Sequence, residues 1–200
     1  MKRTLDVTVS IAALVALAPL LALIAAAVRL SSPGPALFRQ SRLGLFGHPF
    51  LLLKFRSMYV NCADLRCEDG SAISGDNDPR VTPVGRFLRR TSLDELPQLW
   101  NVLTGEMSLV GPRPDQVDQI RFYQGEEFQK LKMKPGLTGL AQISGRNQIS
   151  WERRKQFDVE YVERASLGLD LLILCKTIPY VLSGSDVNAQ APPEKEKVWR

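Results

Sequence analysis

One apolar run near the amino terminus places the strongest constraint on this chain. Residues Ile11 to Val28 form an uninterrupted apolar stretch of about 18 residues, which is the length at which a helix can cross the hydrocarbon core of a bilayer. Lys2 and Arg3 precede the run, as they would in a secretory signal peptide. The run is long for such a peptide, however, and Arg29 follows it directly. We therefore expect a retained membrane helix.

The charges on both sides of the run predict a re-entrant topology. Basic residues stand before it at Lys2 and after it at Arg29 and beyond, so the positive-inside rule draws both flanks to the cytoplasm. Pro19, at the middle of the run, removes a backbone hydrogen bond and permits a bend. We predict that residues 1–32 form a helix that enters and leaves the membrane on the cytoplasmic side. A straight signal anchor with a kink is the competing interpretation.

The remaining sequence predicts an α+β fold that is mostly helical. Two strand-like pieces, Ala36 to Gln40 and Phe50 to Phe55, are separated by glycine turns and predict a small β-hairpin. Leu140 to Ser144 also has the pattern of a strand. Helices are expected near Asp94 to Leu103, at Asp115 to Tyr123, at Glu126 to Met133 and at Ser150 to Glu163, where Ser150 would be the cap.

Three further segments lack the pattern of a packed helix or strand. Leu167 to Leu182 is apolar but interrupted by charges and a proline, so we expect an amphipathic helix in the bilayer interface. Tyr59 to Pro83 is polar and without apolar periodicity, which predicts a long mobile loop. Ala189 to Arg200 contains two prolines and alternating lysine and glutamate, which is typical of a disordered tail.

Two adjacent carboxylates, Asp94 and Glu95, are the strongest candidates for chemistry. They follow Arg89 and Arg90 and stand where a helix is expected to begin. Ser92 and Glu95 also match a capping box, which is a common structural pattern. A helix start and nearby arginines favour the ionised carboxylate, the form that a nucleophile or metal ligand needs.

The helix that follows the carboxylate pair is expected to be packed and rigid. Proline at position 97 is tolerated only in a first turn, which places the helix start near Asp94. Gly105 is placed to end the helix. The residues expected on one apolar face are Leu96, Leu99, Trp100 and Leu103.

Net charge and the setting of the arginines indicate anionic partners. The formal net charge is +5 and the pI is about 9.3, which suits phosphorylated substrates, lipid headgroups or nucleic acid. Arg113 is locked between two prolines and Arg146 follows a glycine, so each guanidinium is presented from a rigid turn. The sequence has no basic run and no aromatic stacking platform, which argues against nucleic acid.

Five segments stand in order along the chain: Lys54-Phe55-Arg56-Ser57-Met58, Ser92-Leu93-Asp94-Glu95-Leu96-Pro97-Gln98, Gly111-Pro112-Arg113-Pro114, Pro135-Gly136-Leu137-Thr138-Gly139 and Gly145-Arg146-Asn147. Together they resemble the bacterial sugar transferases, the monotopic phosphoglycosyl transferases. The resemblance covers nearly the whole chain, and Ala18 stands where similar proteins often carry a serine before the membrane-helix proline.

The resemblance implies an enzyme that moves a phosphosugar from a UDP-sugar to polyprenyl phosphate. It implies that Asp94 is the nucleophile, that Glu95 helps to bind Mg²⁺, and that the chain is the family's minimal catalytic form. Residues 33–188 would then be a catalytic domain at the cytoplasmic face of the bacterial inner membrane, in contact with membrane lipids, and 189–200 a tail. The sequence leaves monomer and homodimer equally open.

The candidate site residues follow from this chemistry, because cleaving a diphosphate requires positive charge on several oxygens. His48, the only histidine, stands in a turn, so no histidine base is expected. Two other functions stay open: a metal-dependent phosphohydrolase, and a membrane-tethered basic protein that binds anionic lipid or nucleic acid. The expected phosphate-binding residues are Arg56, Arg89, Arg113 and Arg146, and the secondary candidates are Lys54, Gln98, Asn147 and Asp158.

Overall fold

The computed structural model describes residues 1–65, 78–145 and 149–183. The loop residues 66–77, the predicted site residues Arg146 and Asn147, and the predicted tail lie outside the described residues. The elements in chain order are α1 (Lys2–Ser31), β1 (Leu37–Leu43), η1 (Leu45–Gly47), β2 (Pro49–Phe55), α2 (Pro83–Arg90), η2 (Leu93–Glu95), α3 (Gln98–Thr104), β3 (Ser108–Val110), η3 (Val117–Phe122), η4 (Gly125–Lys132), β4 (Gly136–Thr138), α4 (Leu140–Ile143), α5 (Trp151–Arg164) and α6 (Leu167–Ser183).

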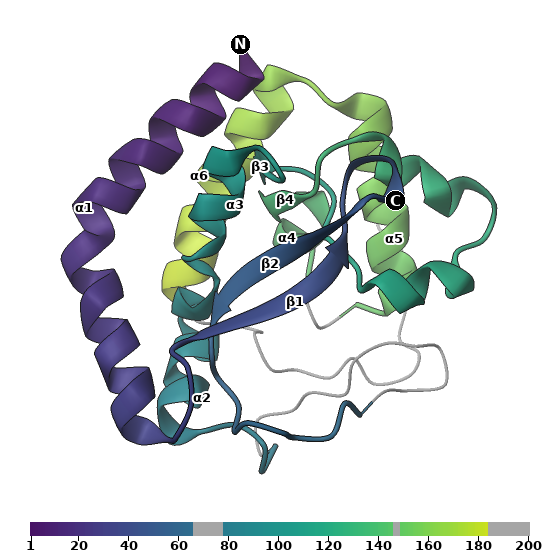
Figure 1. Cartoon of the computed structure of the whole chain (residues 1–200). Helices are drawn as coiled ribbons and strands as arrows, with labels where there is room; N and C mark the ends of the chain where they lie inside the picture. The colour runs from purple at the N-terminus through teal and green to yellow at the C-terminus, as the bar shows by residue number, and fades with distance from the viewer. Residues whose placement is uncertain (66–77, 146–148, 184–200) are drawn as a thin grey trace.

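Helix α1 lies along one side of the molecule as a long arc, and both of its ends contact the rest of the chain (Figure 1). It is long and apolar enough to cross a membrane, and only 11% of its most apolar stretch is buried within the protein. Its apolar surface therefore remains available for lipid. The helix runs through Pro19 without a break in its assignment, so the re-entrant bend stays a prediction.

Polar contacts fix the beginning of α1 to the domain. The Lys2 ammonium donates to the Asp170 carboxylate at 2.6 Å and to the Val110 carbonyl at 3.0 Å. One turn further on, Asp6 accepts from the Ser108 hydroxyl and from the Leu109 amide. Asp6 is only 4% exposed, so these bonds replace the water that a buried carboxylate requires. Strand β3 and helix α6 thus hold the amino-terminal turn of α1.

A hairpin and a hydrophobic core form the centre of the domain. Strands β1 and β2 pair antiparallel from Leu37 opposite Phe55 to Leu43 opposite Pro49, which confirms the predicted hairpin with longer strands. Figure 1 shows the hairpin in front of α3 and α6. The main core cluster contains Phe50, Leu52, Leu99, Val102, Met107, Leu109, Val110, Tyr161 and Ile173.

The backbones of β3 and β4 lie in close contact. The strands pair in parallel, and just beyond them the Gly111 amide donates to the Thr138 carbonyl at 2.9 Å while the Gly136 amide donates to the Pro112 carbonyl at 2.8 Å. A Cβ added to Gly136 would lie 2.0 Å from the Gly111 nitrogen, and one added to Gly111 would lie 2.5 Å from the Lys134 carbonyl oxygen. Neither position has room for a side chain.

Three of the predicted elements differ from the structure. The strand expected at Leu140 to Ser144 is wrong, because Leu140–Ile143 is the short helix α4 and the strand lies earlier, at Gly136–Thr138. The hydrogen bonds to Gly111 and Pro112 select that earlier register. Both helices expected between residues 115 and 133 are present, but each is a 3₁₀ helix, η3 and η4.

The segment around the carboxylate pair is also more broken than expected. Asp94 and Glu95 lie in the 3₁₀ turn η2, and α3 begins only at Gln98. The Ser92 backbone is left-handed, with φ of 56°, and its side chain makes no capping hydrogen bond, so the capping-box prediction is wrong. Trp100 is 54% exposed and does not join the buried face. Gly105 ends α3 with φ of 92°, as predicted.

The two carboxy-terminal helices match their predictions. Ser150 caps α5, and its hydroxyl accepts from the Arg153 amide. Helix α6 turns its one aspartate inward, since Asp170 is 3% exposed. Its exposed apolar residues are Leu167, Leu171, Leu172 and Ile178. Such a helix has the surface that interfacial lipid contact requires, and the interfacial location stays a prediction.

The close contact between the backbones of β3 and β4 gives a direct test of the fold. We expect Gly111→Ala to lower stability by about 1–3 kcal/mol, because the new methyl group must displace backbone atoms. Gly168→Ala is the matched control, since a Cβ there meets nothing within 4 Å, and it should leave the unfolding temperature unchanged or slightly raised. Thermal unfolding of both variants in detergent or nanodiscs measures the difference. Equal unfolding temperatures for the two variants would mean that the backbones at Gly111 and Gly136 are not close-packed.

Candidate active site

Glu95 joins three segments of the chain through ion pairs. Its Oε1 atom accepts from the Lys54 ammonium at 2.8 Å and from the Arg113 guanidinium at 3.2 Å. Lys54 comes from β2, Glu95 from η2, and Arg113 from the loop that follows β3. Burial alone would raise the pKa of Glu95, but the charges of Lys54 and Arg113 hold that pKa well below its usual range. Glu95 is therefore firmly ionised.

Asp94, beside Glu95, has a different environment. It is 8% exposed, and within the described residues no group donates a hydrogen bond to its carboxylate. Burial raises the pKa of Asp94 to about 6, against the attraction of Lys54, and the neighbouring charge of Glu95 acts in the same direction as burial. The expectation that its charged form is favoured is therefore wrong for Asp94 and right for Glu95. Above pH 6 Asp94 is an ionised carboxylate with unused lone pairs.

Arg89 and Arg113 are the two predicted arginines that the structure places in the field of this carboxylate pair. The positive charge of each acts on the pKa of Asp94. The Arg89 Nε–H donates to the Ser57 hydroxyl at 2.9 Å, which fixes its side chain. Lys54, a secondary candidate, joins them as the largest attractive influence on that pKa. The site is thus an anion surrounded by three cations.

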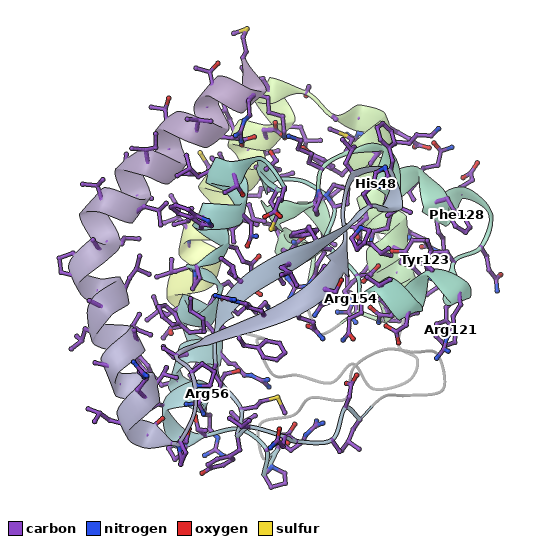
Figure 2. All side chains as sticks on the ribbon, viewed as in Figure 1. His48, Arg56, Arg121, Tyr123, Phe128 and Arg154 are labelled. Atoms are coloured by element: carbon purple, nitrogen blue, oxygen red, sulfur yellow. The ribbon has the colours of Figure 1, made fainter. Side chains whose placement is uncertain are left out.

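Arg56 lies elsewhere, at the carboxy-terminal end of α1 (Figure 2). It is 5% exposed, and its guanidinium donates to the Ser32 carbonyl at 2.9 Å, to the Val28 carbonyl at 3.3 Å and to the Pro35 carbonyl at 2.7 Å. Carbonyls at the end of a helix are the groups that otherwise lack partners. These bonds give Arg56 a structural task at the end of α1 and do not bring it to the carboxylate pair.

The remaining secondary candidates lie beside or behind the site. Gln98, at the start of α3, is 3% exposed. Asp158, on α5, accepts from the Arg113 backbone amide at 3.1 Å, so it supports the loop that carries Arg113. Arg146 and Asn147 lie outside the described residues, and their predicted roles stay predictions.

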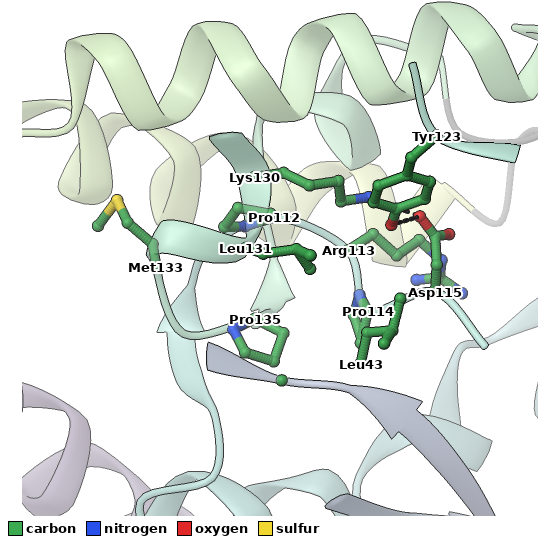
Figure 3. Close-up of a pocket in the computed structure, with 11 residues that line it drawn as sticks. Leu43, Pro112, Arg113, Pro114, Asp115, Tyr123, Lys130, Leu131, Met133 and Pro135 are labelled. Atoms are coloured by element: carbon green, nitrogen blue, oxygen red, sulfur yellow. Dashed lines mark hydrogen bonds and ion pairs between the residues drawn. The ribbon is translucent and has the colours of Figure 1, made fainter. Parts of the chain in front are cut away.

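A buried polar cluster behind Arg113 was missed by the sequence analysis. Asp115 accepts from the Tyr123 hydroxyl at 2.6 Å, from the Lys130 ammonium at 2.8 Å and from the Trp151 indole at 3.2 Å. Figure 3 shows Tyr123, Lys130 and Asp115 gathered beside Arg113. The one available signal was an aspartate directly after the Gly-Pro-Arg-Pro segment, because its partners come from distant parts of the chain.

The carboxylate pair suits a magnesium ion whose coordination shell is completed by oxygens of the substrate. Among the described residues, no three histidine, cysteine or acidic side chains are placed together so that they could hold a metal ion, so they offer no all-protein metal cage. Magnesium commonly takes one or two carboxylates and keeps water and substrate phosphate as its other ligands. Glu95, the predicted ligand, and the adjacent Asp94 suit that arrangement.

A buried anion among cations, close to a helix with uncovered apolar surface, is the arrangement expected of an enzyme that handles phosphorylated groups beside a membrane. The chain belongs to the bacterial sugar transferase family, whose sequence model matches residues 1–184. This confirms the family resemblance of the five segments.

Several curated proteins align with most of the chain. The sugar transferase EpsL of Bacillus subtilis is 44% identical over 182 residues, which is 91% of this chain and 87% of that protein. The exopolysaccharide production protein ExoY of Rhizobium meliloti is 45% identical, over 90% of this chain and 84% of its own. The UDP-glucose:undecaprenyl-phosphate glucose-1-phosphate transferase of Escherichia coli is 46% identical over 89% of this chain, and the match spans 39% of that longer protein.

The unequal pKa values of the two carboxylates predict opposite effects on stability. The folded-state pKa of Asp94, about 6, lies above its usual value of about 3.9, so ionisation destabilises the fold as pH rises through 6. We expect Asp94→Asn to raise the unfolding temperature at pH 8 in the absence of divalent cations, and the gain to shrink as pH falls to 5. Glu95→Gln should lower it at pH 8, because that pKa is depressed. Thermal scans between pH 5 and 8 would contradict this if both variants shifted alike.

Proposed function

We propose that this protein transfers a phosphosugar from a UDP-sugar to a polyprenyl phosphate, giving polyprenyl diphosphate sugar and UMP. One observation carries the proposal: Asp94 is a buried carboxylate without a hydrogen-bond donor in the described residues, placed among Lys54, Arg89 and Arg113. Membership of the bacterial sugar transferase family and the name of the Escherichia coli relative support it. In this reading the enzyme makes the first lipid-linked intermediate of a surface glycan.

The cations prepare the site for the donor diphosphate. Cleavage places negative charge on the leaving UMP, and fixed positive groups stabilise that charge most where water is excluded. Lys54 and Arg113 are held by Glu95, and Arg89 by Ser57, so little reorganisation is needed when the donor binds. The Arg113 side chain is 39% exposed and offers an accessible guanidinium for a phosphate oxygen.

The proposed reaction has two displacements at one phosphorus. An Asp94 carboxylate oxygen attacks the sugar-bearing phosphorus, a P–O bond to Asp94 forms, and the bond to UMP breaks as UMP leaves with the electron pair. An oxygen of polyprenyl phosphate then attacks the same phosphorus, forms the diphosphate, and releases the Asp94 carboxylate. A carboxylate nucleophile needs no base above its pKa, so the proposed reaction does not require a histidine.

Magnesium would be held by Glu95 together with substrate oxygens, and it would supply additional neutralisation of phosphate charge. The protein itself contributes by holding its cationic side chains in position. The ion pairs of Glu95 hold Lys54 and Arg113 at the carboxylate pair, and burial keeps water from competing with the acceptor for the phosphosugar.

The acceptor is a membrane lipid, and α1 and α6 supply the apolar surfaces that bring the site to it. We place the enzyme at the cytoplasmic face of the bacterial inner membrane. Both ends of α1 are tied to the same domain, by Lys2 and Asp6 at one end and by Arg56 at the other. Two ends on one domain favour a helix that enters and leaves on one side of the bilayer.

The mechanism predicts a covalent intermediate that forms without the lipid. Enzyme mixed with the correct UDP-sugar and magnesium should release UMP in a burst close to one per enzyme, and ping-pong kinetics should follow with acceptor present. Mass spectrometry should find the phosphosugar on the peptide that contains Asp94. Asp94→Asn should abolish both burst and adduct, because an amide is a poor nucleophile.

Asp118→Asn is the control for this experiment, since it removes an exposed aspartate on η3 and should leave the burst intact. Initial rates that require both substrates bound together, with no adduct on that peptide, would replace the covalent route with direct transfer. Steady release of sugar phosphate to water, with no lipid product, would indicate a phosphohydrolase.

The topology is tested by labelling at the beginning of α1. A cysteine at position 2 should react with a membrane-impermeant reagent only after spheroplasts are opened, because both ends of α1 are expected in the cytoplasm. Cysteine at an exposed position of the domain, such as Asp118, is the matched control on the same side. Efficient labelling of position 2 in intact spheroplasts would mean that α1 spans the membrane.

A further inference from the structure

A single buried lysine lies between two carboxylates behind the loop that carries Arg113. The Lys130 ammonium is 2.8 Å from an oxygen of Asp115 and 2.7 Å from an oxygen of Asp158, and its side chain is 3% exposed. Asp115 belongs to the loop after β3, Asp158 to α5, and Lys130 to η4. One ammonium group therefore ties together three segments that are far apart in the sequence.

The charges of this cluster make the lysine indispensable to its geometry. Burial favours the neutral amine, but the two carboxylates hold the pKa of Lys130 above its ordinary value, so it remains an ammonium ion. Without it, two buried carboxylates would face each other uncompensated, and removing one partner of such a group is costly because the remaining charge has no water. The Asp115 and Asp158 side chains would then separate or bind a proton.

Both carboxylates act on the backbone next to Arg113. Asp158 uses its other oxygen to accept from the Arg113 amide at 3.1 Å, and Asp115 follows Arg113 by two residues. Pro112 and Pro114 on either side limit the backbone torsions of that turn. The direction of the Arg113 side chain toward Glu95 therefore depends on where Asp115 and Asp158 are held, and Lys130 holds them both. Figure 3 shows Lys130 and Asp115 near Arg113.

We propose that Lys130 is a positioning residue for the transferase site. It fixes the Pro112–Pro114 turn through Asp115 and Asp158 and so holds the Arg113 guanidinium at the donor diphosphate. This inference rests on the proposed function, because it assigns Arg113 to phosphate binding. Among the described residues Lys130 forms ion pairs with Asp115 and Asp158 and none with Asp94 or Glu95, so we expect its effect on catalysis to pass through the turn that carries Arg113.

A double-mutant cycle tests this dependence. Lys130→Met should lower turnover by about a hundredfold, the loss expected when a reacting group is displaced by about 1 Å, and should approach the effect of Arg113→Ala. The two changes together should cost no more than Arg113→Ala alone, since a guanidinium that is absent cannot be misplaced. Turnover is measured as lipid-dependent UMP release, at a temperature where every variant is folded.

Lys155→Met is the matched control for burial and stability. Lys155 also forms a buried ion pair, 2.6 Å from Glu127 with 6% of its side chain exposed, and it lies over the Trp151 ring. It also lies over the Tyr123 ring, but among the described residues its ion pair is with Glu127 and it forms no ion pair with Asp115 or Asp158. We expect a similar fall in unfolding temperature but turnover within a few-fold of wild type. Equal loss of turnover in both lysine variants would assign Lys130 to general stability and overturn the proposal.

Two changes at Asp158 keep the test decisive if Lys130→Met does not fold. Asp158→Asn retains an oxygen that can accept from the Arg113 amide, whereas Asp158→Leu removes it, so turnover should fall further in the leucine variant. Equal turnover in the two would overturn the proposal. Additive losses of turnover from Lys130→Met and Arg113→Ala would also overturn the proposal about Lys130. The activity of the wild-type protein would still support the proposed transferase function in that case. Absence of lipid-dependent UMP release from the wild-type protein, with every UDP-sugar tried, would instead reject the proposed function.

Discussion

The bifurcated ion pair of Glu95 is the interaction on which the site depends. Its one oxygen receives Lys54 from the hairpin and Arg113 from the loop after β3, so the two cations meet only because both segments are correctly packed. A carboxylate that is buried with two cationic partners loses little of its charge to protonation. Glu95 therefore acts as a fixed anion that holds cations close to a second carboxylate, Asp94, to which none of the described residues donates a hydrogen bond.

Leaving Asp94 unpaired costs stability, and this cost has a chemical use. Burial disfavours the charge of Asp94, whereas the same burial removes the water that would otherwise solvate the carboxylate and compete for a phosphorylated intermediate. The two adjacent carboxylates thus have different roles: Glu95 holds the cations in place, and Asp94 is left available to react. A similar division separates Arg56, whose N–H groups bond carbonyls at the end of α1, from Arg113, whose side chain remains accessible.

Sequence alone predicted the features that local physics determines. The cap of α5 at Ser150, the glycine that ends α3, the hairpin and the placement of Asp94 and Glu95 together all follow from neighbouring residues. Elements set by distant partners were predicted poorly: residues 140–143 form a helix because the pairing with β3 is completed at 136–138. The role of Lys130 had no local signal, since its two carboxylates lie 15 and 28 positions away in the sequence. Family resemblance, rather than periodicity, supplied the assignment of the nucleophile.

The contacts at the beginning of α1 also constrain the order of events during synthesis. Lys2 is held by Asp170, 168 positions later in the chain, and Asp6 is held by Ser108, 102 positions later. Neither bond can form before residues 108 and 170 have been synthesised. The contacts that hold the amino-terminal turn of α1 are therefore among the last in the domain to become possible, although α1 itself is made first.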